Sequence, residues 1–449
     1  MYIAGFLLFT VSIFVCLVRG IALMWALLLA FILFFGIGLA KGYKPDELRR
    51  MSAERLPGSL VVLRILALIG ILMGLWRADG TIAYLIYYGV RLIHPQLFIL
   101  ITFVFSSFMS YLLGTSLGVA STAGLIFITL ARSSGADTVI TAGAIMSGIY
   151  FGDRCSPVSS SASLVAAVTG TELYDNVRKM LLSAAVPTVV SAMLYAFLSV
   201  RHPMGEPGEE MLAVLSESFS LTPAVLIPAL LMFVLPILKV SIIKSVSISA
   251  AAAFAVSVLV QGQTLQEVCA SAVFGYHPAN AELAGIMSGG GLISMAKVMI
   301  MIILAALYTG ILNGTGAMDR TEEALEALSG RCGRFAVMII VSVVSAMLFC
   351  NQTIVIMMDS QLMSRLYGDT AEERSALAID IENSGVVIAA LIPWTVACAT
   401  PLAALDAGAD SLPYAFLLYL IPLYWLLRSG FRAKTAGRWG WFQSDHIYQ

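Results

Sequence analysis

Two acidic residues stand inside otherwise apolar stretches of this sequence. Asp153 comes shortly before a Ser-Pro dipeptide, and Glu382 opens the stretch ENSG at 382–385. An ionisable side chain inside a membrane-spanning segment is costly and by default marks a functional site. Carboxylates are also ligands that a small, hard cation prefers. We therefore expect Asp153 and Glu382 to bind Na⁺, with Asp153 also accepting a proton.

Uncharged polar residues and helix-breaking glycine or proline accompany both acids. They lie in GTSLGVASTAG at 114–124, in the Ser-Pro stretch after Asp153, and in CNQT at 350–353. Non-helical backbone at membrane depth is tolerated only where it is buried in protein or lines a wet cavity, and its carbonyl groups can then coordinate a cation. The residues expected to supply neutral ligands or to set the geometry are Thr115, Ser116, Ser156, Asn351, Gln352, Asn383 and Ser384.

Structural roles for the same residues are open alternatives. Glycines spaced as Gly148 and Gly152 commonly do no more than allow close helix packing. Arg154 could neutralise Asp153, although neighbouring residues on a helix point in different directions. Glu382 follows several charged residues, so its helix could begin as a wet surface.

Other chemistries lack their motifs. The 4 histidines form no HExxH zinc motif, GGG at 289–291 precedes no P-loop lysine, and the 6 cysteines show no paired CxxC spacing. We therefore expect no cofactor and no enzyme activity. A channel would need a pore lined by rings of like groups, and a single acid in each half of the chain argues against one.

Long apolar runs supply the elements that must hold these residues. Of the 449 residues, 59% are hydrophobic and 12% charged, whereas soluble domains are about half apolar and a quarter charged. The fold class expected is an all-α, polytopic membrane protein, with the lipid bilayer as its partner and no nucleic acid. Runs suited to crossing about 30 Å of hydrocarbon occur at 3–18, 21–39, 61–75, 97–113, 181–200, 221–238, 298–312, 335–349 and 415–427.

The distribution of charge predicts an orientation. Basic residues gather in 41–56 and after residue 427, whereas 201–219 is mainly acidic. Because cytoplasmic loops carry an excess of Lys and Arg, we place the first two segments inside and the third outside. Both termini then face the cytoplasm, in a multi-pass protein of the cell (inner) membrane.

The sequence also contains an internal repeat. GLWRADG at 74–80 matches GILNGTG at 310–316, and SYLLGTS at 110–116 matches AMLFCNQ at 346–352. Both pairs have the same separation along the chain, which we call the repeat interval. With a deletion of several residues, 151–157 then falls near 380–385. Under the charge placement above, the two units enter the membrane from opposite sides, as in many transporters with inverted repeats.

This repeat predicts the organisation of the chain. Broken or re-entrant helices should lie at its centre, where the polar stretches of the two units meet. The expected parts are an N-terminal hairpin with a cytoplasmic loop (1–55), transport repeat 1 (56–178), connecting helices (179–290), inverted transport repeat 2 (291–405), and a last helix with a cytoplasmic tail (406–449).

Taken together, these motifs resemble the signatures of NhaC-type Na⁺/H⁺ antiporters over roughly residues 56–405. The resemblance implies a secondary transporter of the ion-transporter superfamily, with two inverted bundles and a central cation site. Ser160 and Asn383 stand where that family usually has acids, which leaves fewer groups to exchange protons. The matching stretches are GTSLG at 114–118, GDRCSPVS at 152–159, GGGLISM at 289–295, NQ at 351–352, ENSG at 382–385 and IPW at 392–394.

The expected function is therefore secondary transport, with Na⁺ exchanged for H⁺ at a central carboxylate. An alternative keeps the fold and uses a Na⁺ or H⁺ site to drive an amino acid or small organic acid. Arg154, Arg77 or Trp394 would then contact that solute. A homodimer is compatible with either function.

Overall fold

In a computed structural model, this chain consists of helices joined by short turns. One isolated bridge, between Tyr276 and Gly289, is the β pairing found in the described residues. The predicted cytoplasmic tail beyond residue 436 lies outside them. The structure describes residues 2–19, 21–54, 56–92, 94–205, 209–238, 240–278, 280, 283–284, 287–315 and 332–436.

The helices of the first half lead from an N-terminal hairpin into a run of broken helices. In order they are α1 (Tyr2–Arg19), α2 (Met24–Ala40), α3 (Pro45–Glu54), α4 (Leu56–Ala78), α5 (Thr81–Leu92), η1 (Pro95–Leu97), α6 (Phe98–Leu113), α7 (Ser116–Val119), the π-helical turn η2 (Ala120–Gly124), α8 (Leu125–Ser133), α9 (Thr138–Cys155), α10 (Ser160–Thr169) and α11 (Leu173–Arg201).

The second half repeats this plan. Its helices are α12 (Glu209–Ser218), η3 (Pro223–Leu226), α13 (Ile227–Ile237), α14 (Ile242–Leu259), α15 (Leu265–Phe274), η4 (Leu292–Met295), α17 (Ala296–Gly314), α19 (Arg334–Phe349), α20 (Gln352–Met363), η5 (Ser364–Leu366), α21 (Ala371–Asn383), α22 (Gly385–Ile388), η6 (Ala389–Leu391), α23 (Val396–Ala404), η7 (Ala409–Tyr414) and α24 (Phe416–Ala436).

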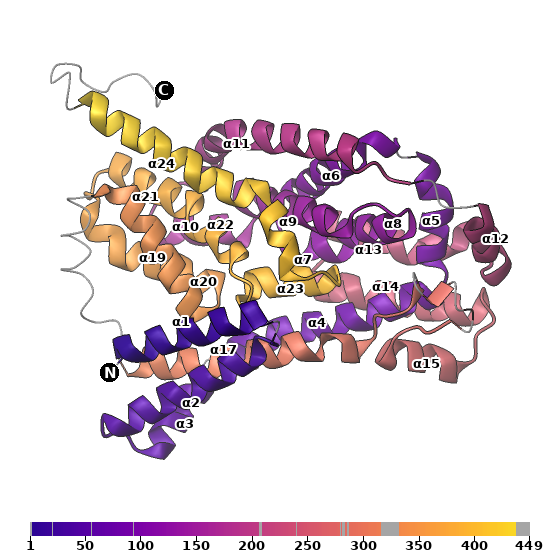
Figure 1. The fold of residues 1–449 in the computed structure, drawn as a ribbon, viewed down its shortest axis with the longest axis horizontal. Coiled ribbons are helices and arrows are strands. Elements are labelled where there is room, and N and C mark those ends of the chain that lie inside the picture. Colours follow the sequence, from indigo (N-terminus) through magenta and orange to yellow (C-terminus); the bar gives the residue numbers. More distant parts are fainter. Residues whose placement is uncertain are drawn as a thin grey trace.

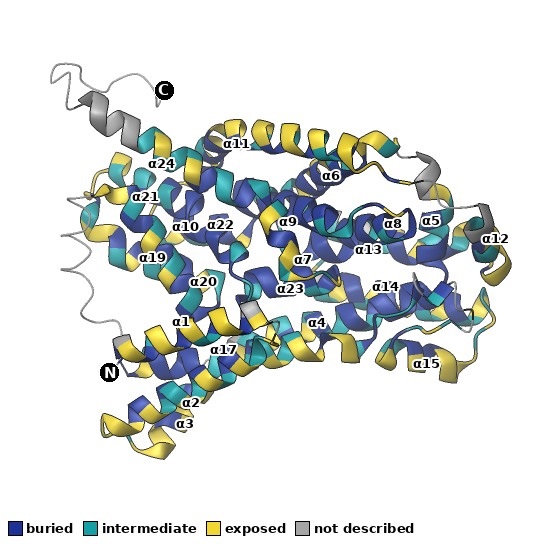
Figure 2. Cartoon of the chain, viewed as in Figure 1, coloured by how far each residue is buried: buried dark blue, intermediate teal, exposed yellow. Residues whose placement is uncertain are grey.

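Several of these helices suit a bilayer. Among the described residues, five are long and apolar enough to cross one, and up to seven spans result if each of two sharply bent pairs counts as one. The outer face of α11 is exposed and apolar (Figure 2), as lipid contact requires, through Leu182, Val186, Val189, Met193 and Phe197. The prediction of an all-α, polytopic membrane protein is confirmed.

Helix bounds recur at the repeat interval, the separation between positions 74 and 310. α6 and α19 are related by it at both ends, since they begin at Phe98 and Arg334 and end at Leu113 and Phe349. The same interval separates the starts of α7 and α20, the starts of α10 and α23, and the ends of α4 and α17. The backbone therefore repeats with the interval found in the sequence.

The deletion assumed in the sequence comparison is wrong. With the repeat interval kept through α10 and α23, Asp153 corresponds to Ala389 and not to Glu382. The shared feature of the two units is the break at Pro157 and Pro393, which are also separated by the repeat interval. The sequence comparison aligned the two motifs because each contains an acid. In the fold, these two acids occupy positions that are not equivalent in the two repeats.

Two matched glycines explain why the sequence repeat is visible. A Cβ atom at Gly74 of α4 would lie 2.1 Å from the carbonyl oxygen of Ser271, and one at Gly310 of α17 would lie 2.3 Å from that of Met51. Each repeat therefore uses a glycine to bring this helix against backbone contributed by the other half of the chain.

Equivalent helices run in opposite directions. Ser52, just before α4, donates a hydrogen bond to the carbonyl oxygen of Leu307 near the end of α17 (3.1 Å). Farther along α4, the Gly70 carbonyl oxygen accepts one from Gly291 N, just before η4 and α17 (2.7 Å). α4 and α17 are thus antiparallel, as an inverted repeat requires. In Figure 1, α1 begins and α24 ends at the left of the molecule, whereas α5, α12 and α15 lie at the right.

Candidate ion-binding site

Two helical hairpins, one in each repeat, approach the centre of the molecule. The first turns from α6 into α7 at Gly114 and Thr115, and the second turns from α19 into α20 at Cys350 and Asn351. Gly114 and Cys350 have left-handed backbone (φ 63° and 54°), and the following residue is extended in both. The side chains of Thr115 and Asn351 then accept a hydrogen bond from the first turn of the next helix. Both predicted residues are therefore helix caps at equivalent hairpin turns.

The hairpin arms pack side by side. In the first, the rings of Phe105 and Phe127 lie 5.5 Å apart between centroids. In the second, Ser342 Oγ donates to Asp359 Oδ2 across the arms (2.6 Å). Each polar turn is thus held at the tip of a rigid pair of helices.

A second kind of break follows each hairpin. The backbone unwinds between α9 and α10 and again between η6 and α23, where Ser159 and Thr395 cap the helices that follow. The same hydroxyls donate back across the breaks, Ser159 to the carbonyl oxygen of Asp153 and Thr395 to that of Ala389 (2.5 Å for Thr395). The equivalent hydroxyls therefore fix the shape of both breaks.

Each break is also fastened to the hairpin of its own repeat. Ser156 Oγ donates to the carbonyl oxygen of Tyr111 (2.6 Å), and Trp394 Nε1 donates to that of Met347 (3.1 Å). Tyr111 and Met347 occupy equivalent positions, separated by the repeat interval. Ser156 and Trp394 are therefore engaged in holding the breaks against the hairpins.

The two hairpin tips converge on Asp153. Its side chain is nearly buried, with 5% of the residue exposed. The backbone N–H of Ser116 faces the carboxylate from the first hairpin. From the second, Gln352 Nε2 donates to Oδ2 (3.4 Å) and also to the carbonyl oxygen of Val386 (2.9 Å). Because helix N-termini favour negative charge, the first residues of two equivalent helix arms stabilise one carboxylate.

Arg154 points away from its neighbour in sequence. Its fully buried guanidinium donates from Nε to the carbonyl oxygen of Glu382 (3.0 Å) and from Nη2 to Asn383 Oδ1 (2.6 Å) and Ser183 Oγ (2.7 Å). It ties α9 to α21 and α11. Among the described residues Asp153 forms no ion pair, so this carboxylate remains available to a cation.

Glu382 is fully buried, which contradicts the alternative of a wet surface at this point. Neither carboxylate oxygen has a hydrogen-bond partner among the described residues, and Asn383 Nδ2 lacks one as well. Arg154 and Asp153 act on the Glu382 carboxylate through their charge. Ser384 lies at the break after α21 and donates to the carbonyl oxygen of Asp380 (2.6 Å).

The predicted residues therefore fall into three groups. Asp153, Ser116 and Gln352 meet at the hairpin tips, whereas Glu382 and Asn383 gather around Arg154. The remaining four shape backbone: Thr115, Ser156, Asn351 and Ser384. Within the described chain no group of three or more His, Cys, Asp or Glu is placed to hold a metal ion. A Na⁺ ion here would need hydroxyl, amide and carbonyl oxygens besides Asp153.

Sequence reasoning missed four residues that shape this region. Ser159 and Ser161 both donate to the Asp153 carbonyl oxygen (2.6 Å for Ser161), and a serine-rich stretch after a break was their signal. Thr395 follows from Ser159 through the repeat interval. Asp359 is a buried acid in an apolar run, which is a signal in its own right.

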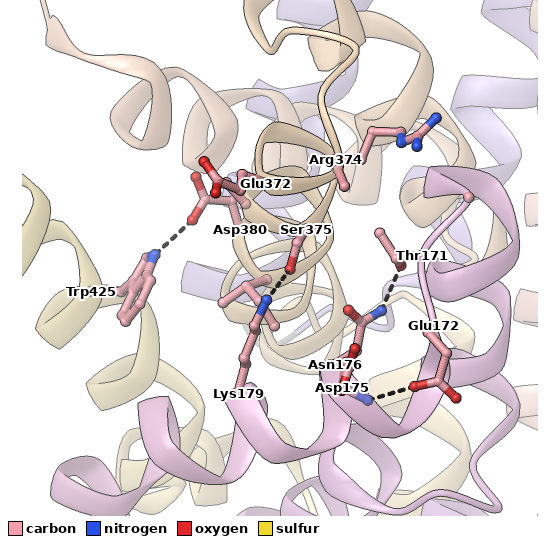
Figure 3. A pocket seen from close by; sticks show the side chains of 14 residues that line it. Thr171, Glu172, Asp175, Asn176, Lys179, Glu372, Arg374, Ser375, Asp380 and Trp425 are labelled. Carbon is pink, nitrogen blue, oxygen red and sulfur yellow. Dashed lines mark hydrogen bonds between the residues drawn. The ribbon is translucent and has the colours of Figure 1, made fainter. Parts of the chain in front are cut away.

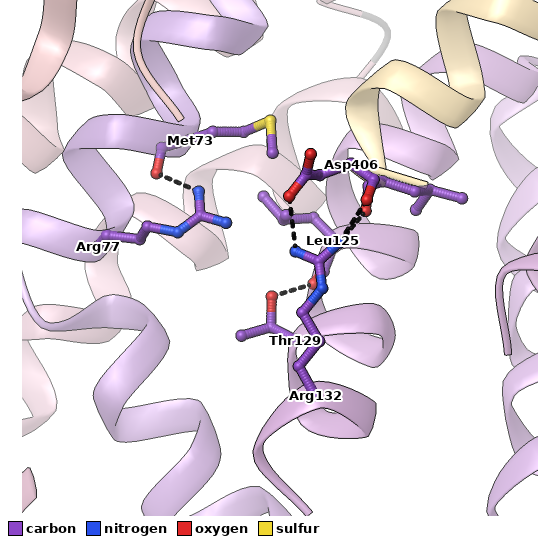
Figure 4. Close-up of polar contacts among 7 residues, drawn as sticks. Met73, Arg77, Leu125, Thr129, Arg132 and Asp406 are labelled. Carbon is purple, nitrogen blue, oxygen red and sulfur yellow. Dashed lines mark hydrogen bonds and ion pairs between the residues drawn. The ribbon is translucent and has the colours of Figure 1, made fainter. Parts of the chain in front are cut away.

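The three residues expected to contact a solute do not meet. Arg154 and Trp394 are engaged as above. The guanidinium of Arg77 lies opposite the Arg132–Asp406 ion pair (3.1 Å), at the far end of α8 (Figure 4). Arg77 Nη1 donates to the carbonyl oxygen of Met73 (3.1 Å), while its Nε has no hydrogen-bond partner among the described residues. Since a helix rises about 1.5 Å per residue, Arg132 lies roughly 24 Å along its arm from Ser116.

A polar pocket of about 390 Å³ opens between the start of α11 and α21, beside Trp425 of α24 (Figure 3). Lys179 Nζ donates to Ser375 Oγ (2.7 Å) on one wall, and Trp425 Nε1 donates to Asp380 Oδ1 (2.6 Å) on another. One residue beyond Lys179, the carbonyl oxygen of Met180 accepts from Arg154 (3.1 Å). The pocket lining and the Arg154 cluster are therefore neighbours along α11.

Comparison with known proteins gives a consistent set of relatives. Residues 148–428 match the model of the Na⁺/H⁺ antiporter family. The chain is 28% identical over 366 residues to the malate-2H⁺/Na⁺-lactate antiporter of Bacillus subtilis (80% of this chain, 78% of the relative). It is 26% identical over 400 residues to the Na⁺/H⁺ antiporter NhaC of Alkalihalophilus pseudofirmus (88% and 86%). The arginine/ornithine antiporter ArcD of Halobacterium salinarum is 27% identical over 395 residues (85% and 81%).

Proposed function

Because this chain belongs to the Na⁺/H⁺ antiporter family, it is a secondary transporter and not an enzyme, and we propose that it exchanges Na⁺ for H⁺ at Asp153. The observation that carries the proposal is the convergence of Ser116 and Gln352 on this one buried carboxylate. Both belong to helix breaks, where the oxygens that a cation needs become available. Glu382 is proposed as the partner acid that adds negative charge to the same region.

One carboxylate can couple the two ions by competition. With a proton on Asp153 the group is neutral and loses its attraction for Na⁺, and with Na⁺ bound the proton must leave. Gln352 links the carboxylate to Val386 of α22, just after the break at Ser384. A change of occupant at Asp153 therefore alters a hydrogen bond that joins the two repeats.

The two ends of the molecule differ in a way that supports access from one side. At one end, a Cβ atom at Gly143 of α9 would lie 2.8 Å from the carbonyl oxygen of Ser411 in η7. The residues that the repeat interval places at the equivalent positions of the other end are Ile379 and Asp175, and both line the polar pocket. This difference in packing supports access from the end that holds the pocket, as in a transporter with alternating access.

We propose that the pocket opens to the cytoplasm and that both termini lie on that side. α1 begins and α24 ends at the end of the molecule that holds α21 (Figure 1). That end also carries the basic stretch around α3.

The division into domains is likewise kept as a proposal. We extend each transport unit by one helix, because the repeat interval relates the start of α11 to the start of η7, and α24 continues that equivalent segment.

A second candidate function is the coupled exchange of an organic solute. Two of the relatives named above are a malate/lactate and an arginine/ornithine antiporter. Arg77 is buried, and in the described part of the chain its Nε has no hydrogen-bond partner, so it is the group that would favour a carboxylate.

Transport in proteoliposomes separates the two functions. Under the first, a Na⁺ gradient alone should change the internal pH with no organic solute present. If Na⁺ flux appears only after malate, lactate or an amino acid is added, the second function replaces the first.

A further inference from the structure

A second unsatisfied carboxylate lies outside the proposed Na⁺ site. Asp359 of α20 is fully buried, and its Oδ1 has no hydrogen-bond partner among the described residues. Its Oδ2 accepts from Ser342 Oγ of α19 (2.6 Å). The equivalent residue of the first repeat is Ala123, so only one hairpin carries this acid.

The surroundings of Asp359 are mostly apolar. Val341, Ile356, Met363 and Val386 belong to the hydrophobic cluster around it. Ser342 is the side chain that acts on its carboxylate, and none of the described Lys, Arg or His residues forms an ion pair with it. A buried ionised carboxylate without a counter-charge is very costly. This arrangement therefore requires a proton or a bound cation on Asp359.

The oxygens within reach suit a proton better than Na⁺. Ser342 Oγ is the hydroxyl that contacts the carboxylate, and it already donates to Oδ2. One serine hydroxyl and one free carboxylate oxygen fall short of the oxygen shell of a hard cation, which usually takes about six ligands. A proton needs only Oδ1.

The carboxylate also faces the break at Ser384, between α21 and α22. A Cβ atom at Gly385 would lie 2.3 Å from Asp359 Oδ2 and 3.1 Å from Val355 Cγ1. Only glycine therefore lets the start of α22 lie against this acid. Glu382 stands three residues earlier, on α21, and is the titratable group which that element brings to the break.

Asp359 is connected to Asp153 through the side chain of Gln352 and the backbone at Gly385 and Val386. Gln352, two helical turns before Asp359 on α20, donates to Asp153 Oδ2 and to the Val386 carbonyl oxygen. Val386 follows Gly385, which touches Asp359. A movement of the break at Gly385 would be felt at both acids.

From this geometry we infer that Asp359 is a second proton-carrying site, separate from the Na⁺ site at Asp153. The inference rests on the proposed Na⁺/H⁺ exchange. In each cycle Asp359 takes a proton from water on one side and releases it to water on the other, in addition to the proton exchanged at Asp153. One Na⁺ then moves against more than one proton, so transport carries net charge.

The test measures the response of exchange to membrane potential in proteoliposomes. Wild-type exchange should speed up or slow down when a potential is imposed, according to its sign. Asp359→Asn should still exchange Na⁺ for H⁺ but lose this response, whereas Asp359→Glu should keep it. The matched control Asp369→Asn, which changes an exposed acid of the same repeat in the same way, should behave as wild type.

The outcomes separate this inference from the function on which it rests. Electroneutral exchange by the wild type, or an unchanged voltage response in Asp359→Asn, overturns the inference alone. Absence of any Na⁺-dependent pH change in the wild type overturns the proposed exchange as well. If Asp359→Asn is inactive, restored voltage-dependent exchange in Asp359→Glu supports an acid at this place. Inactivity of both variants assigns Asp359 to packing and overturns the inference.

Discussion

At the scale of single residues, the acids of this chain differ in how far the protein satisfies them. Asp380 accepts hydrogen bonds from Tyr367 and Trp425. Asp153 has one long side-chain hydrogen bond, and Glu382 has none among the described residues. The acids whose oxygens lack hydrogen bonds are therefore those that can still bind an ion. Among them, Asp153 is the one at which both repeats meet.

Replacing Asp153 by asparagine should abolish exchange without unfolding the protein. The amide has the same shape and lowers the cost of burial, while the backbone carbonyl that Ser159 and Ser161 bind is unchanged. Size-exclusion profiles and thermal unfolding in detergent should match the wild type, and Na⁺-driven pH changes in proteoliposomes should disappear. Exchange at near wild-type rate with the same pH dependence would move the coupling site to Glu382.

At the scale of elements, the sequence predicted the breaks better than the register between them. Gly, Pro and hydroxyl residues located both hairpin turns and both unwound segments, because these residue types are what such backbone needs. The deletion was inferred from the acids, which carry function and need not respect the repeat. Prolines 157 and 393 follow the backbone and therefore show the true interval.

Substitution at the first hairpin turn tests whether its left-handed backbone and close packing require glycine. Gly114→Ala should destabilise the protein for two reasons, a left-handed φ of 63° and a Cβ atom 2.6 Å from the Val158 carbonyl carbon. Left-handed backbone at a non-glycine residue costs on the order of 1–3 kcal/mol. Gly135, with φ 68° and no atom of the described residues within 4 Å of the added Cβ, is the matched control for that cost alone.

Thermal unfolding in detergent should therefore fall further for Gly114→Ala than for Gly135→Ala, and only the former should impair transport. Equal losses in the two variants would mean that close packing of the hairpin on the break between α9 and α10 has no role in stability.

At the scale of the whole molecule, charge and apolar runs were enough to predict a polytopic membrane protein with an inverted repeat. They could not predict which end is open, because that depends on how two similar units differ in their packing. The difference is visible in two places: Gly143 packs closely against Ser411 at one end, whereas the equivalent Ile379 lines a pocket at the other. Composition also could not show that Arg154 forms hydrogen bonds between α9, α21 and α11 and does not pair with Asp153. The direction of this side chain follows from the packing of the three helices.

Cysteine labelling tests the proposed orientation. With the exposed Cys269 and Cys332 replaced by serine, Arg374→Cys in the pocket should react with a membrane-impermeant thiol reagent only in inside-out vesicles. Asp410→Cys, exposed at the opposite end, should react only in intact cells. The reverse pattern would place the pocket and both termini outside.

The dependence of the apparent Na⁺ affinity on pH shows whether Na⁺ and H⁺ share a binding site. If Na⁺ and H⁺ compete for Asp153, the affinity measured from exchange rates in proteoliposomes should weaken steadily as pH falls. It should approach about a tenfold loss per pH unit once the proton dominates, as linkage at one shared site requires. The maximal rate at saturating Na⁺ should change far less. An affinity that stays constant with pH, while only the maximal rate varies, would show that the two ions do not share a site and would contradict the account.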